Sequence, residues 1–256
     1  MTRCDLAVVT ALAEELTPLL QLRRAGSNRH QGGRPGGSGE HCPGRAEPLF
    51  LPGEPSCVLM WTGAGTLAAA RGLDRLLDRY APRWILAGGI AGTSSREIQA
   101  GEVVLAEAVG FYDQDVTALG LPPGTVYRGQ PPLLVPTATL NMDDLLPPGA
   151  LHRGTVLTGN SFLDDRLLRS LPELWQQRIL AAGAIDMESA AWASVAAERG
   201  VPWAVVRTVS DQTFSDARRA FRQTCRQSGE LLLRIATAPE RCILTPKEVL
   251  YDPENH

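Results

Sequence analysis

The sequence has almost no lysine and few histidines, and both shortages exclude enzyme classes. Lys247 is the one lysine among 25 basic residues, and it lies near the C-terminal end. A P-loop needs a lysine after its glycines, and Schiff-base chemistry needs a lysine in the core. The four histidines are scattered, with His152 alone in a loop-like segment. Neither a Ser-His or Cys-His catalytic pair nor a histidine-based metal site is therefore expected.

Paired cysteines and long apolar runs are missing as well. The five cysteines are scattered, with no C-x-x-C pair and no zinc-like spacing, which predicts a reduced, cytoplasmic setting. The N-terminus lacks the pattern of a signal peptide, and no apolar run is long enough for a membrane span. The formal net charge is only −3. We therefore expect neither nucleic acid nor a membrane as a partner.

Apolar strand segments alternate with helical segments along the chain. Strands are predicted at 6–9, 57–61, 84–87, 102–109, 155–157, 182–186 and 203–209, with helices that include 187–199 and one from about 215. This order predicts a single-domain α/β protein with three layers, α/β/α, around a central, mostly parallel mixed sheet. The domain would span 1–237, with a flexible Gly/Arg-rich surface loop at 24–47 and an irregular C-terminal tail at 238–256.

Carboxylates stand where three of these strands end. Glu188 and Asp211 follow two apolar strands and lie 23 residues apart, a separation that one crossover helix fills. Glu14 and Glu15 follow the first strand. In open α/β proteins the carboxyl ends of parallel strands form the ligand-binding edge. Three converging acids at that edge suggest acid–base chemistry on a small polar molecule, because an idle cluster of carboxylates would only destabilise the fold.

A glycine-rich turn offers a competing interpretation. The run 63–68 fits G-x-G-x-x-A and follows a strand, as in dinucleotide-binding proteins. That fingerprint also requires an acid at the end of the next strand, to bind the cofactor ribose. The next strand ends in Ala87-Gly88-Gly89. A tight turn with close helix–strand packing accounts for the glycines equally well, so no organic cofactor and no metal are predicted.

Four segments together resemble a known family: 11–16 (ALAEEL), 111–120 (FYDQDVTALG), 186–188 (DME) and 207–211 (RTVSD). In order and spacing they are similar to the purine nucleoside phosphorylase and nucleosidase superfamily, and most to 5′-methylthioadenosine/S-adenosylhomocysteine nucleosidases. The resemblance runs from the first strand to about residue 236. It implies a nucleoside phosphorylase-like fold, a nucleoside as the small-molecule substrate, and a homodimer in which Phe111 of one subunit helps to close the pocket of the other.

The resemblance also implies roles for single residues. Asp211 matches the acid that donates a proton toward adenine N7, and Glu15 the carboxylate that activates the attacking water. Glu188 matches the acceptor of hydrogen bonds from the ribose hydroxyls, Met187 packs on the sugar, and Arg207 helps to hold the water and to orient Glu188.

Further matches lie on the base side of the site. Phe162 matches the ring that stacks on the base, and Leu163 lies where the family's backbone reads the base. Ser210, beside Asp211, joins the substrate-binding set.

Two arguments from charge and hydrogen bonding favour hydrolysis of an adenine nucleoside. Residues 10–15 offer no arginine for a phosphate ion and end in two carboxylates that would repel it. Asp211 can accept a hydrogen bond from a 6-amino group, whereas Asn would suit a 6-oxo group better.

Ile90 replaces a serine of the family pattern, as in related futalosine hydrolases, so the identity of the 5′ substituent on the substrate stays open. A futalosine-like hydrolase, a phosphate-dependent phosphorylase and a nucleoside-binding regulatory protein remain alternatives.

Overall fold

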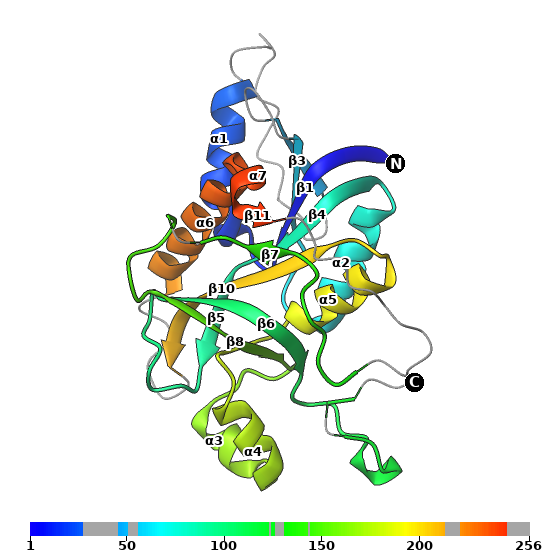
Figure 1. Ribbon diagram of the computed structural model, residues 1–256, viewed down its shortest axis with the longest axis vertical. Helices are drawn as coiled ribbons and strands as arrows, with labels where there is room; N and C mark the ends of the chain where they lie inside the picture. The colour runs from blue at the N-terminus through cyan, green and yellow to red at the C-terminus, as the bar shows by residue number, and fades with distance from the viewer. Residues whose placement is uncertain are drawn as a thin grey trace.

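A computed structural model provides the coordinates of the chain (Figure 1). It describes residues 1–27, 46–50, 56–122, 124–125, 131–142, 144–212 and 221–244. For 23–27, 46–50, 211–212 and 244 only the backbone is described. Most of the predicted loop at 24–47 and the predicted helix start near 215 therefore lie outside the described residues. In the described part, no helix is both long and apolar enough to cross a membrane.

A mixed sheet forms the centre of the molecule, in the strand order β2-β3-β1-β4-β10-β5-β9-β8-β6. Six of its neighbouring pairs are parallel; β2–β3, β5–β9 and β10–β6 are antiparallel. The strands are β1 (Thr2–Thr10), β2 (Ala46–Phe50), β3 (Ser56–Trp61), β4 (Tyr80–Ala87), β5 (Ile90–Thr93), β6 (Val103–Phe111), β8 (Leu151–Thr158), β9 (Ala184–Asp186) and β10 (Trp203–Gln212). The predicted mostly parallel sheet is confirmed.

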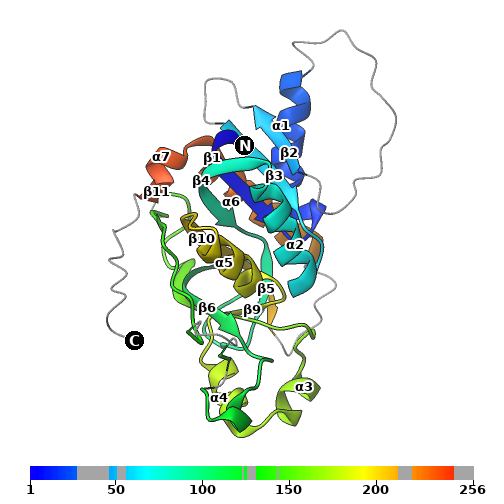
Figure 2. The same ribbon diagram turned by 90° about the vertical axis from the view of Figure 1, so that its right-hand side faces the viewer.

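Helices cover both faces of this sheet, as Figures 1 and 2 show. On β1, Ala7 and Val9 pack with helices α2 (Thr66–Leu77) and α5 (Ser189–Glu198). Leu6 and Val8 point to the other face and pack with η1 (Ala13–Leu16), α1 (Thr17–Ser27) and α6 (Phe221–Thr237). Because successive side chains of a strand point to opposite faces, one apolar strand supplies two cores. The three-layer prediction is thereby confirmed.

The sheet also closes on itself at one end, which the sequence pattern does not reveal. Strand β10 pairs with β4 through its first residues and with β5 through its last, and it also pairs antiparallel with β6. Strands β10, β5, β9, β8 and β6 thus form a closed ring. The register of β10 against β5 shifts between Val209 and Asp211, and such a bulge bends a strand. In this ring, β5 lies between β9 and β10 and pairs with both of them.

Several elements go beyond the predicted set. The short helices α3 (Asp165–Ser170) and α4 (Glu173–Leu180) follow β8. Residues 239–244 are regular where an irregular tail was expected: α7 (Pro239–Cys242) leads into β11 (Ile243–Leu244), which pairs with β7 (Thr139–Leu140). Burial of Cys242 and Ile243 holds this segment on the core. A run this short and flanked by prolines has no local pattern that would predict such a contact.

Candidate functional site

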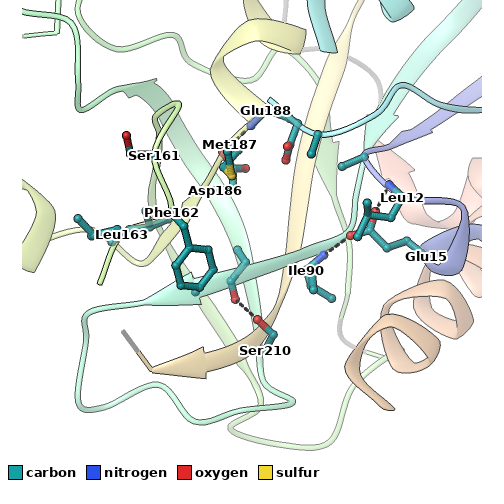
Figure 3. Close-up of a pocket in the computed structure, with 15 residues that line it drawn as sticks. Leu12, Glu15, Ile90, Ser161, Phe162, Leu163, Asp186, Met187, Glu188 and Ser210 are labelled. Atoms are coloured by element: carbon teal, nitrogen blue, oxygen red, sulfur yellow. Dashed lines mark hydrogen bonds between the residues drawn. The ribbon is translucent and has the colours of Figure 1, made fainter. Parts of the chain in front are cut away.

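A cavity of about 160 Å³ lies at the carboxyl ends of the central strands. One water molecule needs only about 10–15 Å³ on the same measure, so the cavity has room for an organic ligand. Glu15 follows β1, Ile90 begins β5, Phe162 follows β8 and Glu188 follows β9, and all four line the cavity. Figure 3 shows Phe162 on one side of the cavity and Glu15 with Glu188 on the other. The predicted edge is therefore where a site forms.

Glu15 is a buried carboxylate in the cavity wall, 1% exposed. Its Oε2 accepts a hydrogen bond from the backbone N–H of Leu12 at 2.8 Å, and its Oε1 accepts one from Ile90 N–H at 2.8 Å. Burial raises the pKa of Glu15, while the nearby Arg207 and the backbone donors oppose that rise. A fixed carboxylate of raised pKa beside a cavity is suited to take up a proton.

The second of the two glycines after β4, Gly89, makes room for this carboxylate. Gly89 has a φ of 136°, and a Cβ on it would lie 2.5 Å from Oε1 of Glu15 and 2.8 Å from Nη1 of Arg207. No other residue type fits both the backbone and the space. The Gly88-Gly89 turn, whose sequence argued against a dinucleotide cofactor, thus leaves space beside the Glu15 carboxylate.

Glu188 lies at the start of α5 and is also buried in the cavity wall. Its Oε1 accepts a hydrogen bond from the backbone N–H of Gly65 at 2.8 Å. The glycine-rich turn after β3 therefore presents a donor to Glu188. The pKa of Glu188 is raised to about 7: burial is the main cause and the charges of Asp186 and Glu15 add to it, while Arg207 and the Gly65 N–H oppose it.

Arg207 on β10 lies behind the acids and is fully buried, 0% exposed. Its Nη2 lies 2.6 Å from Oδ2 of Asp186 and 3.7 Å from Oε2 of Glu188. Its Nε and Nη2 donate to Oγ of Ser189, and its Nη1 donates to the carbonyl of Gly88 at 3.2 Å. Arg207 is not part of the cavity lining. Its contacts are with the acids and their supporting groups, and it does not face the ligand space.

On the opposite side of the cavity, a turn after β8 carries Phe162 and Leu163. The Phe162 side chain is 65% exposed although it borders the cavity, whereas Leu163 is buried. Tyr112 holds the turn by donating from its hydroxyl to the carbonyl of Ser161 at 2.5 Å. An exposed ring above a cavity can stack on a planar ligand.

Not every predicted residue reaches the cavity. Met187 and Ser210 line it, and Oγ of Ser210 donates to the carbonyl of Ala91 at 3.2 Å. Phe111, at the end of β6, is buried and is not part of the cavity lining. The backbone of Asp211 pairs with Gly92 of β5, next to residues of the lining; its side chain lies outside the described part of the chain.

Asp186 is the site residue to which sequence reasoning assigned no role. It ends β9, lines the cavity, and its Oδ1 accepts a hydrogen bond from Oγ1 of Thr158 at 2.6 Å. It belongs to the Asp-Met-Glu run that carried the resemblance. The available signal was a carboxylate directly after two apolar strand residues. Its partner, Thr158 on β8, is distant in the sequence, so the contact could not be predicted from that signal.

Comparison with known proteins identifies the family of this chain. A family model described as the phosphorylase superfamily matches residues 5–238. A 5′-methylthioadenosine/S-adenosylhomocysteine nucleosidase of Geobacillus thermodenitrificans is 32% identical over 197 residues, which cover 70% of this chain and 78% of that protein.

Solved structures share the fold. The nucleosidase of the same name from S. pneumoniae, with a transition-state inhibitor, has a TM-score of 0.70 and 22% identity, over 92% of this chain and 99% of its own. Futalosine hydrolase of Helicobacter pylori has a TM-score of 0.69 and 17% identity, over 92% and 97%.

The raised pKa of Glu188 predicts how stability depends on pH. Between the ordinary pKa of 4.5 and about 7, the folded protein holds a proton that the unfolded chain releases. The stabilisation from this proton is complete below pH 4.5 and is lost as the pH rises through 7. Glu188→Gln, neutral throughout, should remove this loss, which is on the order of 1–3 kcal/mol of unfolding free energy.

Denaturant unfolding at several pH values between 4.5 and 8 measures this effect. Glu14→Gln, which makes the same change at an exposed glutamate next to Glu15, is the control. If Glu188→Gln follows the same pH dependence as the parent protein, Glu188 does not carry the extra proton.

Proposed function

Because this chain belongs to the phosphorylase superfamily and, within it, to the 5′-methylthioadenosine/S-adenosylhomocysteine nucleosidases, we propose that it hydrolyses the N-glycosidic bond of 5′-substituted adenine nucleosides. Its substrates are 5′-methylthioadenosine and S-adenosylhomocysteine, and adenine leaves. The observation that carries the proposal is the buried carboxylate of Glu15 in the cavity wall, fixed by two backbone donors and raised in pKa.

Glu15 acts on the water. N-glycosidic hydrolysis passes through an oxocarbenium-like transition state, with the leaving group and the nucleophile on opposite faces of the sugar. Glu15 lies across the cavity from the Phe162 turn, which suits a water on one face of the ribose and the base on the other. The carboxylate takes a proton from the water as its oxygen bonds to the anomeric carbon, and the C–N bond breaks toward the base.

Asp211 acts on the base, and its proton goes to N7 of adenine as the C–N bond breaks. In support, its backbone pairs with Gly92, which borders the cavity. Phe162 stacks on the adenine ring, and Leu163 lies where the backbone reads the edge of the base. Glu188 accepts hydrogen bonds from the ribose hydroxyls, with Met187 against the sugar; both border the cavity.

Charge in the cavity favours hydrolysis over phosphorolysis. Among the described residues that line it, none is lysine or arginine, whereas Glu15, Asp186 and Glu188 are acidic. Arg207 is committed to Asp186, Ser189 and a backbone carbonyl. A phosphate dianion beside these carboxylates would be repelled, while a neutral water would not.

Base release tests the proposal directly. The protein is incubated with 5′-methylthioadenosine, S-adenosylhomocysteine, adenosine, inosine and futalosine, each with and without phosphate, and free bases are separated by chromatography. Adenine from the first two without phosphate is the expected result. Release of hypoxanthine, from futalosine alone, would show that the substrate has a different 5′ substituent. Ile90, which lines the cavity, would then be the residue associated with that specificity. A need for phosphate would make the protein a phosphorylase, and no release would leave a nucleoside-binding protein.

Two carboxylate variants separate chemistry from binding. Asp211→Asn and Glu15→Gln should each lower kcat by about 10²- to 10⁴-fold, the usual contribution of a positioned proton donor or acceptor. Nucleoside binding by Asp211→Asn, measured by calorimetry, should stay within a few-fold of the parent protein. Glu14→Gln is the control for Glu15→Gln. Unchanged turnover in either variant would remove that residue from the mechanism.

The homodimer is proposed from the resemblance of the Phe111–Gly120 segment and from exposed apolar side chains within it and near it in the sequence. Leu119 and Val135 are 67% and 68% exposed, and Leu121 and Leu133 are also exposed. A second copy of the chain would bury them. Leu119→Glu should yield a monomer in sedimentation velocity, whereas Leu22→Glu, at an exposed leucine of α1, should not. A monomeric parent protein would contradict the proposal.

A further inference from the structure

Asp186, at the end of β9, makes hydrogen bonds or ion pairs to β8, α5 and β10, although no role has been assigned to it. Its carboxylate is buried between β8, α5 and β10, and it also borders the cavity. Oγ1 of Thr158 donates to Asp186 Oδ1 at 2.6 Å, and the same hydroxyl accepts from the backbone N–H of Ala190 at 2.9 Å. The orientation of the Asp186 carboxylate is thus set from both β8 and α5.

The first task of this carboxylate is to hold the turn that carries Glu188. Helix α5 begins at Ser189, and its first N–H groups have no partner within the helix. Asp186 Oδ1 accepts from Glu188 N–H and from Ser189 N–H, each at 3.2 Å. The backbone of Glu188 is therefore tied to Asp186, while its side chain is tied to Gly65 across the cavity wall.

The second task is to hold Arg207. Asp186 Oδ2 lies 2.6 Å from Nη2 of the guanidinium, whereas Glu188 Oε2 lies 3.7 Å away. Asp186 thus provides the short ion pair and leaves Glu188 in a looser one. The charged groups around Glu188 in the described part of the site are Glu15 from η1, Asp186 from β9 and Arg207 from β10.

We propose that Asp186 is a positioning residue for the reaction: it holds Arg207 and the Glu188 turn so that the Glu188 carboxylate stays free to bind the substrate sugar. This inference rests on the proposed function. Without the Asp186 charge, Arg207 turns to Glu188 and ties its carboxylate up. Asn at position 186 keeps an oxygen for the two N–H groups but loses the charge, so it isolates the second task.

The experiment compares Asp186→Asn with Thr158→Val, which removes only the hydroxyl that orients the carboxylate. Asp74→Asn is the matched control, because Asp74 pairs with Arg199 on the exposed side of α2 and α5. For Asp186→Asn we expect kcat/KM for 5′-methylthioadenosine to fall about 10- to 100-fold, and the Kd of adenine to stay within about two-fold. Thr158→Val should change kcat/KM in the same direction and by less. Asp74→Asn should leave both values unchanged.

A pH profile separates positioning from a structural role. The acid limb of kcat/KM should move to lower pH by roughly one unit in Asp186→Asn, because a repelling charge next to Glu188 is gone and Arg207 is released toward it. The pH dependence of unfolding should show the same shift without any substrate. That second readout tests Asp186 even if the parent protein releases no adenine, an outcome that would overturn the proposed function alone.

The inference fails if Asp186→Asn keeps the kcat/KM and the pH profile of the parent protein. It also fails if adenine binding and turnover fall together with no shift of the acid limb, because a general loss of structure would do that. If Asp186→Asn does not fold, Thr158→Val decides: a reduced kcat/KM with unchanged adenine binding supports positioning, and unchanged kcat/KM overturns it.

Discussion

The buried guanidinium of Arg207 is the interaction on which the site depends. A fully buried charge is costly unless it is paired and its hydrogen bonds are satisfied. Here Asp186, Ser189 and a backbone carbonyl meet it, with Glu188 slightly farther away. The ring of Trp192 lies 5.1 Å from it. One positive charge thus permits several carboxylates to share a small buried volume, and burial keeps the pKa of two of them raised.

Strand closure brings these groups together. Glu15 follows β1 at the open end of the sheet, while Asp186 and Glu188 follow β9 in the closed ring. Strand β10 belongs to both parts, because it pairs with β4 first and with β5 and β6 later. Arg207 lies within this change of partners and therefore contacts groups from both. Two glycines support the acids in different ways: Gly89 leaves the space that the Glu15 carboxylate fills, and Gly65, at a φ of 91°, directs its N–H to Glu188.

The arrangement divides the cavity into an acidic side and a side for a flat ligand. Glu15 and Glu188 form the acidic side, and the Phe162 turn forms the other. Such a division matches a reaction in which a sugar lies between a water and a planar leaving group. The fold itself serves both nucleosidases and other enzymes, so the choice of reaction rests on the charges of the cavity wall and not on the architecture.

The layers of the fold, the family and the residue types of the site could all be predicted from local features of the sequence. Apolar strand segments that alternate with helices predicted the mostly parallel sheet, and the acids at strand ends predicted the edge where the cavity lies. The structure confirms the fold and brings Glu15, Glu188, Met187, Phe162, Leu163 and Ser210 to one cavity; their roles, and that of Asp211, stay predictions. Local patterns carry this information because periodicity and strand ends are local properties.

The contacts between these residues could not be predicted in this way and are visible only in the folded protein. It shows Arg207 behind the acids, Phe111 away from the cavity, and Asp186 joined to Thr158. It also shows the closure of β6 onto β10 and the ordered segment at 239–244. Each of these depends on the register between strands that are far apart in the chain, and register is set by the summed packing of both faces. No window of neighbouring residues contains that sum.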